Sequence, residues 1–219
     1  MISVLCASRK DSKHLAQFVS KFLTMTKGDV ELLVMVNKHD TWNKAFIELT
    51  KDRVKYFYED YGYGREGLHI YFNDLLKHAR GDWILYMCED HTFIKNGWDE
   101  LVREFIKKRG LVPTKIEIVV PRFEGTGAVA HMVSRAFVDV AGRMGGYGNI
   151  DSWFGMLHAN MSEGRFHPMD EAIFYDYTID KDTPEKPIKT KLPGWDSSKV
   201  KSDLEHEYKK LNQAIKEGR

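Results

Sequence analysis

The sequence predicts an α/β fold: a mostly parallel sheet flanked by helices, followed by a C-terminal extended segment and helix. Three apolar runs are continuous rather than alternating in polarity, which is typical of parallel strands with helices over both faces. Helical patterns separate these runs, and the order strand, helix, strand, helix, strand implies right-handed crossovers within one sheet. The predicted strands cover residues 2–7, 30–36 and 82–88.

The predicted helices follow from apolar residues that recur at helical spacing. Residues 12–25 carry such a stripe, and so do residues 68–79. The amphipathic stretch 96–110 predicts a third helix, with Gly110 as its stop signal. Residues 116–123 predict a further strand, with Pro121 at its end.

The composition changes near residue 178, which predicts a two-part organisation. Residues 1–177 hold the predicted α/β elements, and residues 178–219 hold the remainder. The proline-containing stretch TIDKDTPEKPIKTKLPGWDSSK predicts an extended wrap or linker. The charged stretch KSDLEHEYKKLNQAIKEG then predicts a surface helix or tail.

The overall composition excludes several classes of protein. The formal net charge is +1, so no global field favours nucleic acid or an anionic membrane. No apolar run approaches the roughly 18 residues of a membrane span, and the N-terminus carries no basic leader. The cysteines, Cys6 and Cys88, lie in apolar runs, which suits buried reduced thiols. We therefore expect a cytoplasmic protein without a membrane span.

Polar residues follow each predicted parallel strand. The segments are ASRK after the first strand, NKHD after the second and CEDH after the third. In a parallel α/β sheet, ligands bind beyond the carboxyl ends of the strands, so we expect the three segments to form one site. None contains a G-x-G-x-x-G or G-x-x-x-x-G-K-[ST] pattern, which argues against a dinucleotide site and a P-loop.

The stretch from Gly67 to Tyr86 has the form G-x-x-x-x-x-N-x-x-L-x-x-A-x-G-D-W-I-L-Y and leads into an acidic cluster. This pattern resembles the nucleotide-sugar domain of family 2 glycosyltransferases, which have the GT-A fold. Asn73, Ala79 and Gly81 match the family's positions, and the resemblance extends over about residues 1–177. It implies that Asn73 belongs to the donor-binding region.

The resemblance also implies a variant D-x-D motif at CEDH. Cys88 stands where the first Asp of the motif would stand, and Asp90 stands at the second. Because Mg²⁺ and Mn²⁺ prefer oxygen ligands, Asp90 is the expected metal ligand and Cys88 an unexplained substitution. Glu89 is expected at the donor ribose or at a water of the metal shell, and His91 is a further candidate ligand. The alternative is that CEDH is a solvated turn.

Many GT-A enzymes supply a further metal ligand from a C-terminal histidine. His167 is the candidate for that role in this chain, and Asp176 is the alternative. An ordinary loop histidine would explain His167 equally well.

The donor nucleotide is expected on the ends of the first two strands. The resemblance implies that Ser8 and Arg9 lie near the base and diphosphate, and that Asn37 replaces an Asp that reads the uracil or ribose. Arg65 and Gly67 precede the helix that carries Asn73, and an arginine there can pair with a phosphate. The expected donor is a UDP-sugar, although the loss of charge at Asn37 leaves the nucleotide open.

The expected general base is Asp151, in the segment NIDSWF. The resemblance places an acid in this region, and a carboxylate there can take the proton of an acceptor hydroxyl as the anomeric carbon is attacked. The alternative is that Asp151 caps a helix that begins at Ser152 or Trp153.

These features predict an inverting glycosyltransferase dependent on Mn²⁺ or Mg²⁺. One alternative is a sugar-1-phosphate nucleotidyltransferase, against which the absence of glycine from ASRKDSKH counts. Another is an inactive nucleotide-sugar or glycan-binding module, which the cysteine at position 88 keeps open. The acceptor stays open among a glycan, a protein, a lipid and a modified nucleobase.

Overall fold

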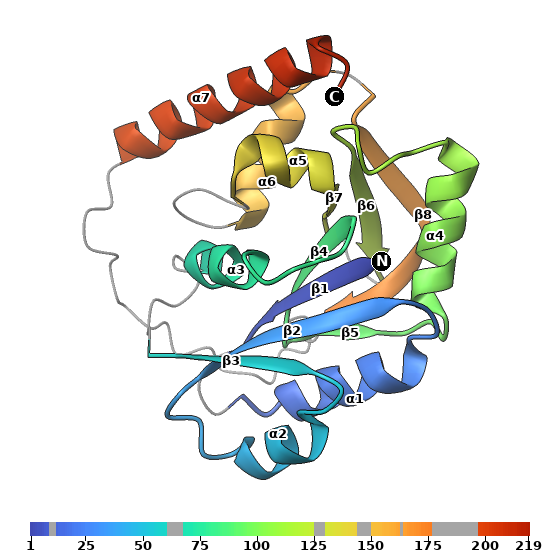
Figure 1. Ribbon diagram of the computed structural model, residues 1–219, viewed down its shortest axis with the longest axis vertical. Coiled ribbons are helices and arrows are strands. Elements are labelled where there is room, and N and C mark those ends of the chain that lie inside the picture. Colours follow the sequence, from blue (N-terminus) through green and yellow to red (C-terminus); the bar gives the residue numbers. More distant parts are fainter. Residues whose placement is uncertain (9–11, 61–67, 125–129, 144–149, 163, 177–196) are drawn as a thin grey trace.

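The fold is organised by a sheet whose strands run in the order β3-β2-β1-β4-β7-β6-β8-β5 (Figure 1). The computed structural model describes residues 1–8, 12–60, 68–124, 130–143, 150–162, 164–176 and 197–219, and the backbone alone at residues 151, 152, 176 and 197–201. β1 (Ile2–Ala7) lies between β2 (Val30–Asn37) and β4 (Trp83–Cys88), and these strands are parallel. The α/β sheet predicted from the sequence is therefore confirmed.

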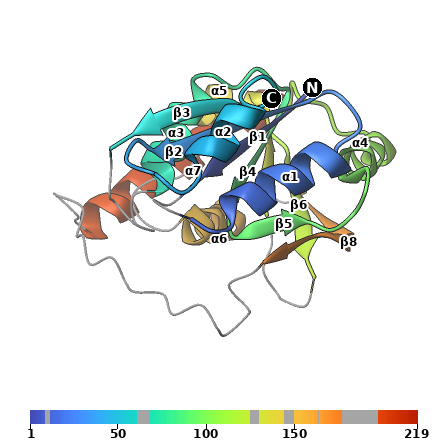
Figure 2. The ribbon, with the colours of Figure 1, turned by 90° about the horizontal axis from the view of Figure 1, so that it is seen from below.

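Helices cover both faces of the sheet (Figure 2). Because side chains alternate along a strand, neighbouring residues of β1 enter opposite cores. Val4 enters the core on one face of the sheet, named here the α1-side core, and Leu5 enters the core on the other face, named the α6-side core. The α1-side core lies under α1 (Leu15–Met25), α2 (Lys44–Thr50) and α4 (Trp98–Arg109). The α6-side core lies under α3 (Leu68–Leu76), α5 (Arg135–Ala141), α6 (Ile150–Asn160) and α7 (Ser197–Lys216).

The helices predicted from the sequence are present with shorter bounds. The first begins at Leu15 rather than at residue 12, and α3 ends at Leu76 rather than at residue 79. α4 ends at Arg109 and is capped by Gly110, whose φ of 65° lies in the left-handed region that favours glycine. Gly110 is therefore the stop signal that the sequence predicts.

Several elements were not predicted. β5 (His91–Phe93) and β7 (Met132–Ser134) are too short to show a periodic pattern, and β3 (Lys55–Glu59) is a half-exposed edge strand. β8 (Phe166–Asp176) lies between β6 (Ile118–Phe123) and β5. Pro121 was expected at the end of its strand but lies within β6, where the pairing with β8 shifts register between Val120 and Arg122. An irregular position of this kind tolerates the missing N–H of proline.

The C-terminal helix α7 contributes to the α6-side core. Leu204 and Leu211 are buried there, and the buried Glu207 accepts hydrogen bonds from Arg143 Nε and, at 2.7 Å, from Trp153 Nε1. α7 therefore packs through one face instead of projecting as a tail. The division predicted at residue 177 stays a prediction, because residues 177–196 lie outside the described segments.

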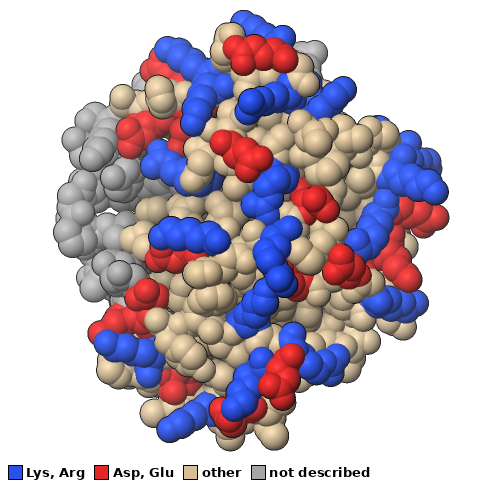
Figure 3. Space-filling model, viewed as in Figure 1, with Lys and Arg blue, Asp and Glu red and all other residues tan. Residues whose placement is uncertain are grey.

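The surface carries both signs of charge. Lys and Arg are interspersed with Asp and Glu over the face shown in Figure 3. Within the described part of the chain, no helix has the length and apolar character that crossing a membrane requires.

A carboxylate network ties together the N-terminal ends of the parallel strands. Glu31 of β2 accepts hydrogen bonds from Ser3 Oγ (2.7 Å), Lys55 Nζ (2.7 Å) and the Arg80 backbone N–H (2.6 Å). Burial by itself would raise the pKa of Glu31, but the hydrogen bonds from these three donors outweigh burial and lower it from 4.5 to about 2. Glu31 therefore links the start of β1, β3 and the turn before β4.

This network predicts a pH-dependent stability. Because the pKa of Glu31 is lower in the folded than in the unfolded chain, its stabilisation is fully present above pH 4.5 and is lost as the pH falls toward about 2. We expect Glu31→Gln to unfold at lower urea concentration than the parent at pH 7, and the difference to shrink as the pH falls through that window. Urea titrations at pH 7, 4 and 3 measure it. An equal difference at every pH would contradict this assignment.

Candidate functional site

The predicted polar strand ends meet at one edge of the sheet. In the parallel ladders Ala7 pairs with Met35 and with Cys88, so β1, β2 and β4 end side by side. The backbone N–H of Ser8 continues this pairing by donating to Met35 O at 2.9 Å. The segments after the three strands therefore begin together, as the sequence predicts for a parallel sheet.

Two acids stand at the end of β4. Glu89 is 2% exposed and the Asp90 side chain 14% exposed. Burial raises the pKa of the Cys6 thiol well above its ordinary value, and the charges of Glu89 and Asp90 raise it further. The negative charge of the two acids is therefore felt on the neighbouring strand β1. The end of β4 is therefore a region of negative potential, and its carboxylate oxygens are the donors that Mg²⁺ and Mn²⁺ prefer.

His91 is arranged as a partner of Asp90. The Cys88 backbone N–H donates to His91 Nδ1 at 3.2 Å, and the imidazole packs against the Phe123 ring with centroids 4.6 Å apart. Because Nδ1 accepts a hydrogen bond, the neutral ring carries its proton on Nε2, which lies 3.9 Å from Asp90 Oδ1. This distance is beyond a hydrogen bond, and the protonated Nε2 has no lone pair for a metal on the side that faces Asp90.

The two cysteines are free thiols on opposite faces of the sheet. Cys6 belongs to the α1-side core, whereas Cys88 packs against the α6-side core. Cys88 therefore borders the candidate site without the oxygen ligand that the D-x-D pattern calls for. Nothing in the structure explains the substitution.

The structure places His167 away from Asp90, so the metal role expected for it stays a prediction that this geometry does not favour. Through the ladders of β8, β6, β7 and β4, His167 is level with Leu85, which is five residues before Asp90. Across the sheet, three strand spacings of about 4.8 Å separate β8 from β4, which is roughly 14 Å. His167 Nε2 instead lies 2.7 Å from Glu117 Oε2, and Arg165 donates to the other Glu117 oxygen at 2.9 Å.

Asp176, the alternative to His167, lies at the correct edge. It pairs with His91 in the antiparallel ladder between β5 and β8, next to Asp90. Among side chains that the structure describes, no three of His, Cys, Asp or Glu converge as a preformed metal cluster. The side chain of Asp176 is not among them. The oxygen donors at the end of β4 nevertheless suit a hard divalent cation.

The end of β2 presents an amide. Asn37 Oδ1 accepts a hydrogen bond from the His39 backbone N–H at 2.9 Å, so the group that Asn37 offers to a ligand is its Nδ2 donor. Beside it, Lys38 and His39 both pair with Asp60, at 2.5 Å and 2.9 Å, which fastens the end of β2 to the end of β3.

Of the other expected donor residues, Arg9, Arg65 and Gly67 lie outside the described residues.

A buried polar network that was not predicted joins the loops after β1 and β2. Asn43 Nδ2 donates to Ser12 O at 3.1 Å and to Asp40 Oδ2 at 2.8 Å, and all three residues are buried. The Asn43 backbone N–H also donates to Asp40 Oδ1 at 3.0 Å. An Asp three residues before the Asn that begins α2 is typical of a turn held by side-chain to backbone hydrogen bonds, and this spacing would have revealed the pair. Asn73 is half-buried on α3, which packs on β1 and β2.

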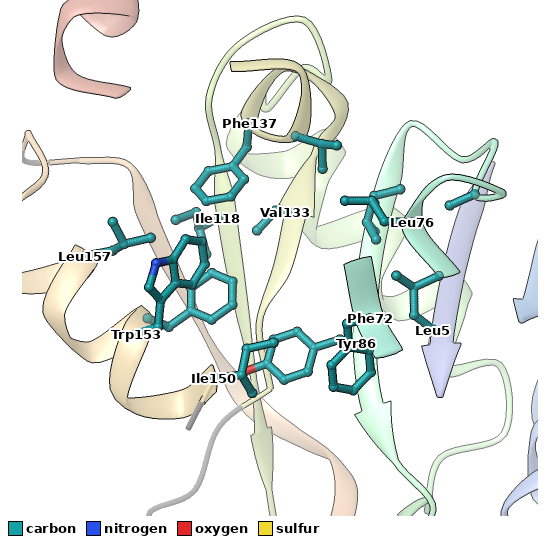
Figure 4. Packing of buried hydrophobic residues seen from close by; sticks show 14 of the residues in the cluster. Leu5, Phe72, Leu76, Tyr86, Ile118, Val133, Phe137, Ile150, Trp153 and Leu157 are labelled. Atoms are coloured by element: carbon teal, nitrogen blue, oxygen red, sulfur yellow. The ribbon is translucent and has the colours of Figure 1, made fainter. Parts of the chain in front are cut away.

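The start of α6 lies close to β4. Asp151 is in the first turn of this helix, which begins at Ile150, so it is not the N-cap residue that the alternative required. Figure 4 shows Ile150 beside Tyr86. The rings of Tyr86 and Phe154 are stacked with centroids 5.5 Å apart. The first turn of α6 and the end of β4 are therefore neighbours across the α6-side core.

No family model and no curated protein matches the sequence. Similar solved structures include TarS of S. aureus in complex with UDP, with 14% identity, a TM-score of 0.62 and coverage of 80% of this chain and 59% of that chain. The mannosyltransferase PcManGT from Pyrobaculum calidifontis, in complex with GDP-Man and Mn²⁺, has 12% identity, a TM-score of 0.62 and coverage of 80% and 56%. A cytidylyltransferase from Leptospira borgpetersenii has 16% identity, a TM-score of 0.55 and coverage of 99% and 94%.

The likeness to these structures shows the fold. The chain has the GT-A glycosyltransferase fold, as the sequence predicts. It spans 36% of the length of TarS and 59% of the TarS fragment 1–349.

Proposed function

We propose that this GT-A chain is a metal-dependent inverting glycosyltransferase that moves a sugar from a nucleotide-sugar donor to an acceptor hydroxyl. The observation that carries the proposal is the pair of acids, Glu89 and Asp90, at the strand edge where a GT-A fold binds its donor. The similar structures include complexes with UDP, UDP-GlcNAc and GDP-Man, so a UDP-sugar is the first donor to test.

In this proposal the donor diphosphate lies at the end of β4. Asp90, with Asp176 opposite His91, would hold Mn²⁺ or Mg²⁺, and Glu89 would contact the ribose or a water of the metal shell. The bound cation would supply the neutralisation of charge on the leaving diphosphate. His91 Nε2 lies 3.9 Å from Asp90 Oδ1, so the imidazole borders the proposed metal site. The nucleoside would lie over Ser8, Arg9 and Asn37.

Asp151 is the proposed general base. Its carboxylate takes the acceptor hydroxyl proton while the acceptor oxygen forms a bond to the anomeric carbon from the face opposite the leaving group. The bond between the anomeric carbon and the diphosphate oxygen breaks, and its electron pair leaves with the nucleoside diphosphate. One displacement of this kind inverts the anomeric configuration.

We further propose a cytoplasmic location, which the free thiols of Cys6 and Cys88 suit.

Replacing Asp151 tests the base. We expect Asp151→Asn to bind nucleoside diphosphate as the parent does and to lose transfer by about 10²-fold, since the amide cannot take a proton. Calorimetry of nucleotide binding and initial rates of transfer measure the two effects. The matched control is Asp139→Asn, at an exposed position of α5, which should keep the parent rate. Parent-like transfer by Asp151→Asn would place the base elsewhere.

A second candidate function is nucleotidyl transfer, and one observation favours it. The cytidylyltransferase covers nearly all of this chain and is itself nearly all covered, whereas TarS is much longer. The products separate the candidates. Glycosyl transfer with a panel of nucleotide sugars and Mn²⁺ releases nucleoside diphosphate, whereas nucleotidyl transfer from a nucleoside triphosphate to a sugar phosphate releases pyrophosphate. Nucleotide binding without either product would favour an inactive binding module.

A further inference from the structure

Three rings from three elements lie nearly parallel between β4 and α6. They are Tyr86 of β4, His131 just before β7 and Phe154 of α6. The centroids of His131 and Phe154 are 4.1 Å apart at an interplanar angle of 3°, and those of Tyr86 and Phe154 are 5.5 Å apart at 8°. Tyr86 and His131 are 6.2 Å apart at 6°. We call these residues the Tyr86–His131–Phe154 stack.

The stack is polar although it is buried among apolar residues. Tyr86 is 2% and His131 7% exposed, and the Tyr86 hydroxyl lies 3.2 Å from His131 Nδ1. Burial, with a smaller contribution from His158, lowers the pKa of His131 to about 3, so the imidazole is neutral at physiological pH. Packing alone does not call for this pair, because burying a hydroxyl and an imidazole costs free energy that two apolar side chains would not cost.

The hydrogen bond between Tyr86 and His131 fixes the orientation of the His131 ring. A phenyl ring at position 131 could rotate within its plane, whereas an imidazole hydrogen-bonded to Tyr86 has one preferred orientation. Buried hydrogen bonds of this kind rigidify a core and select a single arrangement of its elements. The hydrogen bond joins β4 to the residue before β7 on the neighbouring strand, and Phe154 of α6 stacks on the His131 ring that this bond orients.

Each end of the stack is close in sequence to a residue of the proposed site. Tyr86 lies two residues before Cys88 on β4, the strand that ends at Glu89 and Asp90. Phe154 lies three residues after Asp151 on α6, about one turn along the same helix. Any shift of α6 against β4 would therefore move the proposed base relative to the proposed metal site.

We propose that Tyr86 and His131 are positioning residues: their hydrogen bond fixes the rings on which Phe154 of α6 stacks, and so holds the first turn of α6, with Asp151, at a defined place against the end of β4. This inference rests on the proposed function. It assigns neither residue contact with a substrate. The expected consequence of loosening the stack is a misplaced base, and a misplacement of about 1 Å can cost as much as about 10²-fold in rate.

The test uses variants that keep the rings and remove the hydrogen bond. Tyr86→Phe, His131→Phe and the double variant should each lower kcat for transfer by about tenfold, and the double variant no more than the singles, since all remove the same interaction. Nucleoside diphosphate affinity should stay within about twofold of the parent, because the donor half is untouched. The matched control is Tyr56→Phe, which removes a hydroxyl 2.7 Å from Thr50 Oγ1. Tyr56 packs against the α1-side core, on the other face of the sheet, so this variant should transfer sugar at the parent rate.

Hydrogen exchange provides a readout that does not depend on activity. In Tyr86→Phe, amides in the first turns of α6 should exchange about tenfold faster, whereas those of α4 should not change. Unaltered exchange in α6, or single-variant losses of rate that add in the double variant, would overturn the inference. If the parent chain transfers no sugar from any donor, the proposed function fails instead, and exchange in α6 alone decides the role of the stack.

Discussion

Replacing Asp90 by alanine is expected to lower sugar transfer by about 10³-fold or more. In the proposed function Asp90 holds the divalent cation, and the charge stabilisation that a metal provides is worth several kcal/mol, with each 1.4 kcal/mol equal to a factor of ten in rate. The measurement is the rate of nucleoside diphosphate release with Mn²⁺ and a panel of nucleotide sugars. Titration calorimetry with nucleoside diphosphate should show that Mn²⁺ strengthens binding to the parent and not to Asp90→Ala.

The control separates loss of the metal from loss of the fold. Asp170→Ala removes an exposed carboxylate from β8, away from the end of β4, and should transfer sugar at the parent rate. The thermal midpoint of Asp90→Ala should stay close to that of the parent. Metal-dependent transfer by Asp90→Ala within about threefold of the parent would exclude Asp90 as the ligand. Full activity of chelator-treated parent protein would exclude the metal altogether.

Replacing Gly81 by alanine is expected to lower the free energy of unfolding by about 3 kcal/mol or more. A Cβ at this position would lie 2.5 Å from the Ser3 backbone N, 2.6 Å from Ser3 Oγ and 2.9 Å from the carbonyl carbon of Ile2. These atoms belong to β1, which lies between two parallel strands and cannot shift freely. The Gly81 N–H also donates to Ser3 Oγ at 2.7 Å, and Arg135 Nε donates to the Gly81 carbonyl at 3.0 Å.

The matched control is another glycine-to-alanine change. Gly155 lies inside α6, and apart from the local helix backbone no atom lies within 4 Å of the position a Cβ would take, so Gly155→Ala should leave stability unchanged or raise it by about 0.5–1 kcal/mol. Urea denaturation of both variants measures the difference. A Gly81→Ala midpoint equal to that of the parent would show that the contact with β1 relaxes without cost. The glycine of the motif before β4 would then need another explanation.

The central strands could be predicted because their composition shows that both of their faces are buried. β1, β2 and β4 are apolar at nearly every position, and only strands covered on both faces have that pattern. β5, β7 and β8 escaped prediction for the opposite reason. β5 and β7 have three residues each, which are too few to show a periodic pattern. β8 mixes exposed and buried positions around its register shift with β6.

The candidate site divides in the same way. Ser8, Asn37, Glu89 and Asp90 follow parallel strands, so local sequence was enough to expect them at one edge of the sheet. His167 and Asp176 both fall within β8, and only the register of that strand distinguishes them. β8 carries them to different levels of the sheet, and it is Asp176 that pairs with His91, next to the acids at the end of β4.

By itself, the sequence determined the class of fold, the central strands and the acids at the end of β4, because each depends on residues close together in the chain. Tertiary structure alone decided that β8 brings Asp176 opposite His91, that α7 completes a core, and that Tyr86, His131 and Phe154 stack between β4 and α6. These contacts join residues far apart in sequence. Their formation depends on how strands pair and helices pack, which no local pattern of polarity records.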